Sequence, residues 1–298
     1  MINIVLLAIH YPFAIASYYV KALQNRADVN LQVVGPDHGN WIPWMGGMYL
    51  DQKYAPHVDI PMQKFTASVL PSAFWNALPW QPDLIINIDA GYHMATKPQC
   101  DYAVVGTDAH CLDYDVQRGM ADKFFNMHER YSKPGDIHLP YAYSPDYHYP
   151  EAVPMQYDAC LIGMPYPQRN QLAAQLRGAG VNLYFNNGEV FDEYRRVYRS
   201  SAVGLNWASM DDLNARHFEL LAMKVPSVQF HTTDADLYFE NGKDYLSFKT
   251  ASEAKEKVLY LLQHKDEAMQ MAESGYEKVK EHTYDARISQ ILKEFGYQ

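Results

Sequence analysis

Two series of short apolar segments alternating with helix-like segments constrain the fold more than any other feature of this sequence. The first series opens with the continuous apolar run at 2–8, which is typical of a strand buried in a parallel sheet. A helix is expected near 13–25 and a strand at 31–34, and two further apolar runs predict strands at 84–88 and 102–106. Strands joined by helices form βαβ units, so the first half is predicted to be an α/β domain.

A proline-rich stretch separates the two series. Four prolines fall between residues 140 and 158, and proline at this density stiffens an extended chain and prevents a continuous helix. After it the alternation restarts, with strands expected at 157–162, 181–185, 202–205 and 227–230 and helices at 168–179, 191–199, 213–224, 252–263, 265–281 and 284–295. The sequence therefore predicts two doubly wound Rossmann-like domains, residues 1–150 and residues 151–298, which face each other across a ligand-binding cleft.

Composition limits the kinds of partner and the location that suit such a protein. The chain has 298 residues and a formal net charge of −10, which disfavours a protein whose whole surface binds nucleic acid but leaves room for a local basic cleft. Its three cysteines, Cys100, Cys111 and Cys160, form no CxxC pair, so neither a disulfide framework nor a thiolate zinc site is expected. The sequence opens without a basic leader, and its apolar runs are too short to span a bilayer, which favours a cytoplasmic protein.

Polar side chains follow three of the expected strands in the first half. His10 follows the first strand, Asp89 the third, and Asp108 with His110 the fourth. Because the carboxyl ends of parallel strands meet at one edge of a sheet, we expect these residues to converge. Histidine and aspartate are the usual acid–base groups, which makes all four catalytic candidates. They are also usual metal ligands, so a metal-dependent hydrolase is an alternative, and a structural hydrogen bond is the commoner role of any single histidine.

A predicted helix start in the second half carries Arg216 and Glu219, which are three residues apart and therefore neighbours on one helix face. The free N–H groups and the dipole of a helix N-terminus favour a diphosphate, and an arginine adds its guanidinium fork. A carboxylate one turn later can accept hydrogen bonds from two ribose hydroxyls. Asp211, Asp212 or Asn214 is expected to cap this helix. The alternative is a surface ion pair between Arg216 and Glu219, which contributes little to stability.

The loop after the strand at 157–162 offers a second candidate contact with phosphate. Gly163 lies where a phosphate can approach the backbone, and Pro167 suits a first helical turn, which places Arg169 near the helix N-terminus. The segment is neither a GxGxxG motif nor a P-loop. A solvated arginine that binds no ligand is the alternative for Arg169.

The second half resembles the C-terminal domain of CgeB-like (spore-maturation-protein type) glycosyltransferases, which are relatives of the large retaining GT-B group. The resemblance rests on residues 157–163 with Arg169 beyond, residues 194–206, the block 216–219 with Ala222 and Pro226, and the tail 275–287. It implies a GT-B fold in which residues 1–150 form the acceptor-side domain and residues 151–298 the donor-binding domain, with the last helix able to pack back on the first domain.

The sequence departs from the family pattern at three places. The broader group has two glutamates separated by seven residues, and this chain has Asp211 and Glu219 there, so the match is better for the ribose contact than for the sugar contact. Lys224 replaces a glycine shortly before Pro226. The segment 10–12 replaces the glycine loop that usually follows the first strand.

The resemblance implies a glycosyltransferase that transfers a hexose from a nucleotide-diphosphate sugar, UDP-glucose by analogy, to an acceptor. The implied donor-binding residues are Gly163, Arg169, Asn206, Asp211, Arg216 and Glu219, with the base near 184–190. The implied catalytic residues on the acceptor side are His10, Asp89, Asp108 and His110. No metal and no cofactor besides the nucleotide sugar is expected, because GT-B enzymes offset the charge of the leaving group with side chains and helix dipoles.

The acceptor and two rival functions stay open at this point. The acceptor is a glycan, a protein, a small molecule or a modified DNA base of the phage type, and residues 41–80 are a plausible acceptor-facing insertion. One rival function is a metal-dependent hydrolase built on the His/Asp clusters. The other is a non-catalytic module that binds nucleotide sugars.

Overall fold

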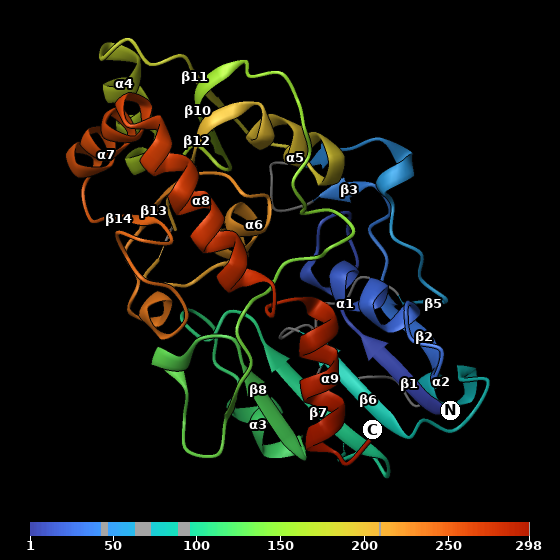
Figure 1. Cartoon of the computed structure of the whole chain (residues 1–298). Coiled ribbons are helices and arrows are strands. Elements are labelled where there is room, and N and C mark those ends of the chain that lie inside the picture. Colours follow the sequence, from blue (N-terminus) through green and yellow to red (C-terminus); the bar gives the residue numbers. More distant parts are fainter. Residues whose placement is uncertain (43–46, 63–72, 89–95, 209, 298) are drawn as a thin grey trace. The chain divides into compact units, whose positions relative to one another are not determined.

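The computed structural model describes residues 1–42, 47–62, 73–88, 96–208 and 210–297 (Figure 1). The chain divides into two compact units. Unit 1 comprises Met1–Pro140 together with Tyr284–Gln298, and unit 2 comprises Tyr141–Thr283. Most of the proline-rich stretch that was expected to be a linker therefore belongs to unit 2, and the chain returns to unit 1 for its last helix.

Unit 1 is built on a parallel sheet, to which seven strands of the described residues contribute. They are β1 (Ile2–Leu7), β2 (Val29–Pro36), β5 (Ile60–Met62), β6 (Leu84–Ile88), β7 (Asp101–Gly106), β8 (Lys123–Asn126) and β9 (Ile137–His138). They lie in the order β5-β2-β1-β6-β7-β8-β9, and each neighbouring pair is parallel. The chain runs outward from β1 to β2 and β5 and returns to β6, so the sheet has a topological switch point between β1 and β6.

The last helix packs against the first one in unit 1 (Figure 1). The Tyr284 ring of α9 (Tyr284–Glu294) stacks on Tyr18 of α1 (Ile15–Gln24) at 5.1 Å and meets Tyr19 edge-on at the same distance. Arg287 of α9 is buried, and its Nε donates to Pro140 O at 2.8 Å. The other described elements of unit 1 are α2 (Ala73–Ala77), α3 (Asp115–Met120), 3₁₀ turns at Gln52–Tyr54 and Glu129–Tyr131, and the hairpin of β3 (Trp41–Ile42) with β4 (Met48–Tyr49).

Unit 2 contains a second parallel sheet. Its described strands are β10 (Tyr157–Ile162), β11 (Leu183–Asn186), β12 (Ser201–Asn206), β13 (Ser227–Phe230) and β14 (Leu246–Phe248), in the order β11-β10-β12-β13-β14. Its helices are α4 (Pro167–Gly178), α5 (Phe191–Arg199), α6 (Ala215–Ala222), α7 (Ala251–Gln263) and α8 (Lys265–Val279), with a 3₁₀ turn at Thr233–Leu237. Every neighbouring pair of these strands is parallel, so this unit is also doubly wound.

The alternation of side chains along β10 explains why helices cover both faces of this sheet. Ala159 and Leu161 point to one face, where they pack with residues of α4 and α7. Cys160 and Ile162 point to the other face, where they pack with α5 and α6. Residues buried on both faces of a sheet are expected to be apolar, and the four buried residues at the end of β10, 159–162, are apolar.

Most predicted elements are found close to the expected bounds. The strands at 84–88, 157–162 and 227–230 agree with β6, β10 and β13 residue for residue. The helix expected at 213–224 is shorter and ends at Ala222, because Lys224 adopts a left-handed conformation with φ 56°. Six short strands were not predicted, namely β3, β4, β5, β8, β9 and β14.

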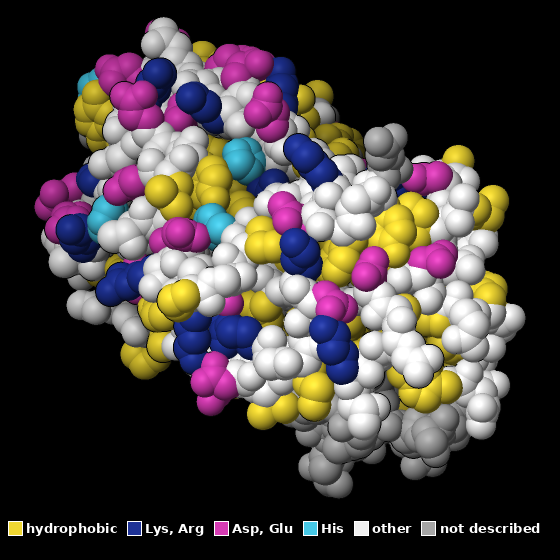
Figure 2. Space-filling model, turned by 90° about the horizontal axis from the view of Figure 1, so that it is seen from below, with side chains coloured by type: hydrophobic (Ala, Val, Ile, Leu, Met, Phe, Trp, Pro, Cys, Tyr) yellow, Lys and Arg dark blue, Asp and Glu magenta, His cyan; other side chains and the backbone are white. Residues whose placement is uncertain are grey.

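None of the described helices combines the length and the hydropathy that crossing a membrane requires. On the face shown in Figure 2, basic and acidic side chains of the described residues lie interspersed. A mixed surface of this kind differs from the continuous basic surface that nucleic acid attracts, which agrees with the net charge of −10.

Candidate functional site

A glycine after β10 brings two arginines of unit 2 together. Gly163 has φ 143°, and a Cβ atom there would lie 2.6 Å from Arg169 Nη1 and 3.6 Å from Arg216 Nη2. A side chain at this position would therefore displace the guanidinium group of Arg169 and contact that of Arg216. Glycine permits the backbone conformation and also leaves room for two cations beside the main chain.

Arg169 is held by main-chain carbonyl groups. It lies in the first turn of α4, which begins with Pro167, and its side chain is buried. Nε and Nη2 donate to Trp207 O at 3.0 and 2.5 Å, and Nη1 donates to Met164 O at 3.0 Å. Burial and the neighbouring Arg216 lower the pKa of Arg169 to about 10, so the guanidinium is still charged at neutral pH. The alternative of a solvated arginine is wrong.

Arg216 lies in the first turn of α6 and retains an unused donor. Its Nη1 donates to Asn206 Oδ1 at 3.5 Å, whereas its Nε is buried without a hydrogen-bond partner among the described residues. Burial acts to lower the pKa of Arg216, but the oxygens of Tyr194, Tyr198 and Glu219 outweigh burial and raise it. In the described part of the chain, neither Arg216 nor Arg169 forms an ion pair with a carboxylate.

Asn206 accepts the hydrogen bond from Arg216 and is itself held by two neighbouring side chains. It ends β12 and is buried, and its amide donates to Asn214 Oδ1 at 3.0 Å and to Gln229 Oε1 at 3.2 Å. Asn214 occupies the N-cap position of α6, but its side chain does not cap the helix. Asp211 lies in the loop between β12 and α6 and is partly buried.

Glu219 is a buried carboxylate with two partners. Only 8% of the residue is exposed, the Tyr194 hydroxyl donates to its Oε2 at 2.7 Å, and His148 Nε2 lies 3.7 Å from its Oε1. His148 Nδ1 accepts the N–H of Ser144 at 3.2 Å, so a neutral His148 carries its proton on Nε2, toward Glu219. Burial lowers the pKa of His148. The alternative of a surface ion pair with Arg216 is wrong.

Unit 1 has a cavity of about 230 Å³ at the switch point of its sheet. It lies at the carboxyl ends of β1, β6 and β7 and beside the start of α1, where ligands of open α/β sheets bind. Its lining residues are Ala8, Ile9, Tyr11, Ala14, Ile15, Ala16, Ile88 and Asp108.

The catalytic candidates occupy different places around this cavity. Asp108 lines it, and the Thr107 hydroxyl donates to Asp108 Oδ2 at 2.8 Å. His10 is completely buried with Nε2 3.0 Å from Val34 O, and burial lowers its pKa, so its contacts are those of a structural histidine. Asp89 lies outside the described residues.

A tight turn places His110 near Asp108. The N–H groups of Cys111 and Leu112 donate to Asp108 O at 2.9 and 2.8 Å. Potential ligand atoms of Asp108, His110 and Cys111 lie within 4.8 Å of one another, and zinc accepts this set of donors. Cys111 was not predicted to be a possible metal ligand.

A histidine just after β8 contacts the residue that precedes Asp108. His128 Nε2 lies 2.9 Å from Thr107 O, and the His128 N–H donates to Asn126 Oδ1 at 3.0 Å. The amide of Asn126 donates in turn to Asp136 Oδ2 at 3.2 Å. These bonds connect the turn that carries Asp108 to a network of ion pairs.

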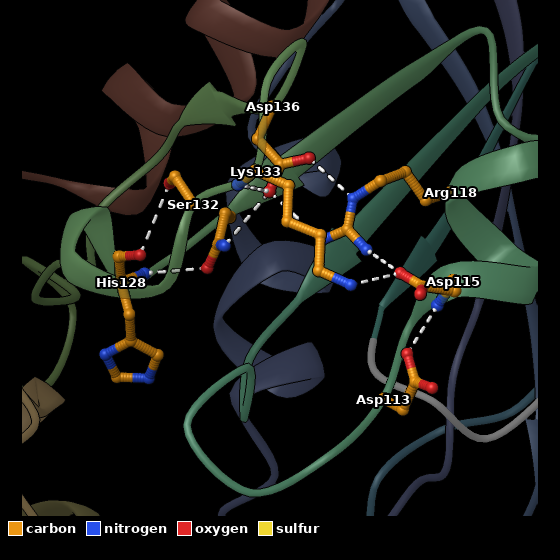
Figure 3. Close-up of polar contacts among 8 residues, drawn as sticks. Asp113, Asp115, Arg118, His128, Ser132, Lys133 and Asp136 are labelled. Atoms are coloured by element: carbon orange, nitrogen blue, oxygen red, sulfur yellow. Dashed lines mark hydrogen bonds and ion pairs between the residues drawn. The ribbon is translucent and has the colours of Figure 1, made fainter.

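Figure 3 shows this network. The Asp136 side chain is completely buried and receives Arg118 Nε at 2.6 Å and Arg118 Nη2 at 3.0 Å. Arg118 Nη1 and Lys133 Nζ both bind Asp115 Oδ1, at 2.9 and 2.5 Å. The two-point pair of Arg118 with Asp136 fixes the direction as well as the distance of the contact. It joins α3 to the loop before β9.

Comparison with protein families gives one match. A family described as "Glycosyl transferase-like" matches residues 155–293. This segment is a glycosyltransferase-like domain. The domain contains both arginines, Glu219 and all five described strands of the sheet of unit 2, together with most of α9. No curated protein matches the sequence.

Solved structures resemble the chain over almost its whole length. HepE from Anabaena, solved with UDP and glucose, has a TM-score of 0.69 at 9% identity and covers 99% of this chain and 100% of its own. Sucrose-phosphate synthase from Thermosynechococcus elongatus has a TM-score of 0.66 at 12% identity, with 99% of each chain covered. An alpha-glucosyltransferase solved with UDP-glucose and DNA has a TM-score of 0.63 at 10% identity, again with 99% of each covered. The predicted GT-B fold is confirmed.

Two residues that contact Glu219 were not predicted as site residues. Tyr194 lies on α5 and begins the block 194–206 on which the family resemblance partly rests, but the resemblance gave it no role. His148 lies in the proline-rich stretch, which was interpreted as a linker. A histidine among four prolines and several tyrosines was the only available signal for it.

Proposed function

We propose that the protein is a CgeB-like glycosyltransferase that transfers a sugar from a UDP-sugar, such as UDP-glucose. The observation that carries this proposal is the pair of guanidinium groups, Arg169 and Arg216, packed beside Gly163 without a carboxylate partner among the described residues. Two cations held this close repel each other, and a bound diphosphate would relieve that repulsion.

The diphosphate would lie where α4 and α6 begin. Both arginines come from first helical turns, and neither helix has a side-chain cap or an acidic residue in that turn. Free N–H groups and helix dipoles then add to the two guanidinium charges. The buried Nε of Arg216 would gain a phosphate oxygen as its acceptor.

Glu219 would bind the ribose. Tyr194 and His148 hold its two oxygens from the protein side, and a carboxylate has lone pairs left for two further donors. The base would lie near 184–190, where the Tyr184 hydroxyl and the Asn186 amide both donate to Glu189 Oε1, at 2.5 and 2.6 Å. HepE and the alpha-glucosyltransferase were solved with UDP and UDP-glucose, which supports a uridine donor.

The acceptor would bind to unit 1, where Asp108 orients its hydroxyl and His110 assists. Both residues lie at the carboxyl end of β7. The test is transfer or hydrolysis of UDP-glucose, followed by mass spectrometry, together with calorimetry of UDP. We expect a dissociation constant in the micromolar range. Failure of every nucleoside diphosphate to bind would overturn the proposal.

One observation favours a second function, a metal-dependent hydrolase. The group of Asp108, His110 and Cys111 offers oxygen, nitrogen and sulfur ligands on one turn. A bound zinc ion would supply a water of lowered pKa as nucleophile. Activity that is lost in excess EDTA and restored by zinc would support this function, whereas the glycosyltransferase is expected to keep its activity in EDTA.

A further inference from the structure

The cavity at the switch point of unit 1 has the size of a pocket for a single ring. Its volume of about 230 Å³ lies below the range of roughly 300–1,000 Å³ found for drug-sized ligands. A monosaccharide or one heterocycle fits such a space, whereas a chain of sugars would have to extend out of it. The β1–α1 loop contributes Tyr11, whose half-buried ring meets Phe13 edge-on at 5.6 Å.

Among the described residues, the side chains that line this pocket are apolar apart from those of Tyr11 and Asp108, and polar atoms contribute nearly as much of the lining surface as apolar ones. Ile9, Ile15 and Ile88 line it together with three alanines, and Tyr11 adds an aromatic ring. Among the described lining residues, Asp108 alone carries a formal charge. The Thr107 hydroxyl donates to one of its oxygens, Oδ2, and a carboxylate has lone pairs for further donors.

The start of α1 supplies hydrogen-bond donors beside this pocket. Ala14 occupies the N-cap position without a side-chain hydrogen bond, and the first turn contains no acidic residue. The first N–H groups of a helix lack partners inside the helix. A hydroxyl group can accept from such an N–H and donate to a carboxylate, so a pocket with both suits a hydroxyl.

We propose that this pocket binds the acceptor as an uncharged ring that carries hydroxyl groups, with the ring on Tyr11 and the isoleucines and a hydroxyl on Asp108. The pocket thereby selects against phosphorylated acceptors. This inference rests on the proposed function. A phosphate in this small pocket would lie close to the carboxylate of Asp108, and the juxtaposition of two like charges is unfavourable. The N-terminus of α1 offsets part of this repulsion, but its charge is only a fraction of a unit.

The experiment compares rings that differ only by phosphate. Fructose with fructose 6-phosphate, glucose with glucose 6-phosphate, and 5-hydroxymethyl-2′-deoxycytidine with its 5′-monophosphate are added at pH 8, where an ordinary histidine is neutral. Binding is measured by saturation-transfer NMR with UDP present, and transfer by release of UDP from UDP-glucose. We expect at least one neutral ring to bind, about tenfold or more tightly than its phosphate.

Variants connect the selectivity to the pocket. Asp108→Asn should reduce the discrimination against phosphate, whereas Asp113→Asn, an exposed carboxylate nearby, should leave it unchanged. Ile15→Trp should fill the pocket and abolish ring binding, while Ile15→Val should preserve it. Calorimetry of UDP serves as the check on folding in each variant.

Two results would overturn the inference. One is equal or tighter binding of the phosphorylated rings to the wild type, and the other is binding of no neutral ring at all. In both cases UDP would still bind, so the proposed function would survive. Absence of UDP binding would instead contradict the proposed function itself, and the two failures are therefore distinguishable.

Discussion

Substitution of Glu219 by glutamine should weaken the binding of UDP-glucose and cost less stability than substitution by alanine. Glutamine keeps the shape of the side chain and an oxygen that can accept from the Tyr194 hydroxyl, now 2.7 Å from Glu219 Oε2. It removes the negative charge that strengthens hydrogen bonds from ribose hydroxyls. Charge-assisted bonds contribute about 1.5–3 kcal/mol and neutral ones about 1 kcal/mol, so we expect about a tenfold loss of affinity.

Alanine at the same position should cost more in two separate ways. It forfeits the ribose contacts completely, which corresponds to a ten- to hundredfold loss of affinity. It also leaves the buried Tyr194 hydroxyl without its acceptor, which costs about 1–3 kcal/mol of the free energy of unfolding. The matched control is Glu193→Gln on α5, because Glu193 is exposed to solvent.

The assay is calorimetry with UDP and with 2′-deoxy-UDP, supported by urea denaturation of each variant. The wild type should prefer UDP, and Glu219→Ala should bind both nucleotides about equally. If the variant and the wild type discriminate equally between the two nucleotides, Glu219 is not the ribose ligand. The reasoning from its burial and its partners would then be refuted.

Three further predictions concern unit 1 and the end of α6. Asp108→Asn or His110→Ala should lower turnover by a factor on the order of 100 without changing the affinity for UDP, and wild-type rates in both would remove this turn from the mechanism. Lys224→Gly should raise the free energy of unfolding, measured by denaturation, by about 0.5–1 kcal/mol. The reason is that φ 56° at Lys224 favours glycine, and only part of this gain is lost to the entropy of the unfolded chain. A lower free energy of unfolding would show that the ion pair of Lys224 with Glu273 dominates. Burial acts to raise the pKa of Asp136, but hydrogen bonds from Arg118 and others outweigh burial and lower it. The contribution of Asp136 to stability is therefore complete above about pH 4 and is lost as pH falls below that value. Asp136→Asn should therefore cost about 3 kcal/mol at pH 7 and flatten the dependence of stability on pH below about pH 4. An unchanged pH profile would contradict this assignment.

The sequence was sufficient for the buried strands and insufficient for the short ones. β10 was predicted residue for residue because its buried part, residues 159–162, is a continuous apolar run and Gly163 follows it. β9 and β14 have two and three residues. So few residues show no period, and their strand character depends on neighbours that are distant in sequence.

The arginine pair was accessible to sequence reasoning, whereas the partners of the carboxylate were not. A strand followed by Gly163 and a helix start is a local pattern, and it led to Arg169 directly. The contact between His148 and Glu219 joins a proline-rich segment to a helix, and local periodicity carries no information about it. Proline density correctly excluded a helix there but said nothing about burial.

Histidines illustrate a second limit. His10 and His110 both follow strands of the same sheet, and the sequence alone treats them alike. The structure buries His10 completely against Val34, whereas His110 remains partly exposed on the turn with Asp108. Burial depends on the packing of β2 beside β1, which a pattern within one segment cannot reveal.

The most direct test of the proposed donor site compares UDP with uridine by calorimetry. The two ligands differ only in the diphosphate, which is assigned to Arg169 and Arg216. The account predicts that UDP binds about a hundredfold or more tightly than uridine, and that Arg216→Met removes most of this difference. Equal affinities for UDP and uridine in the wild type would contradict the account, because the paired guanidinium groups would then bind no phosphate.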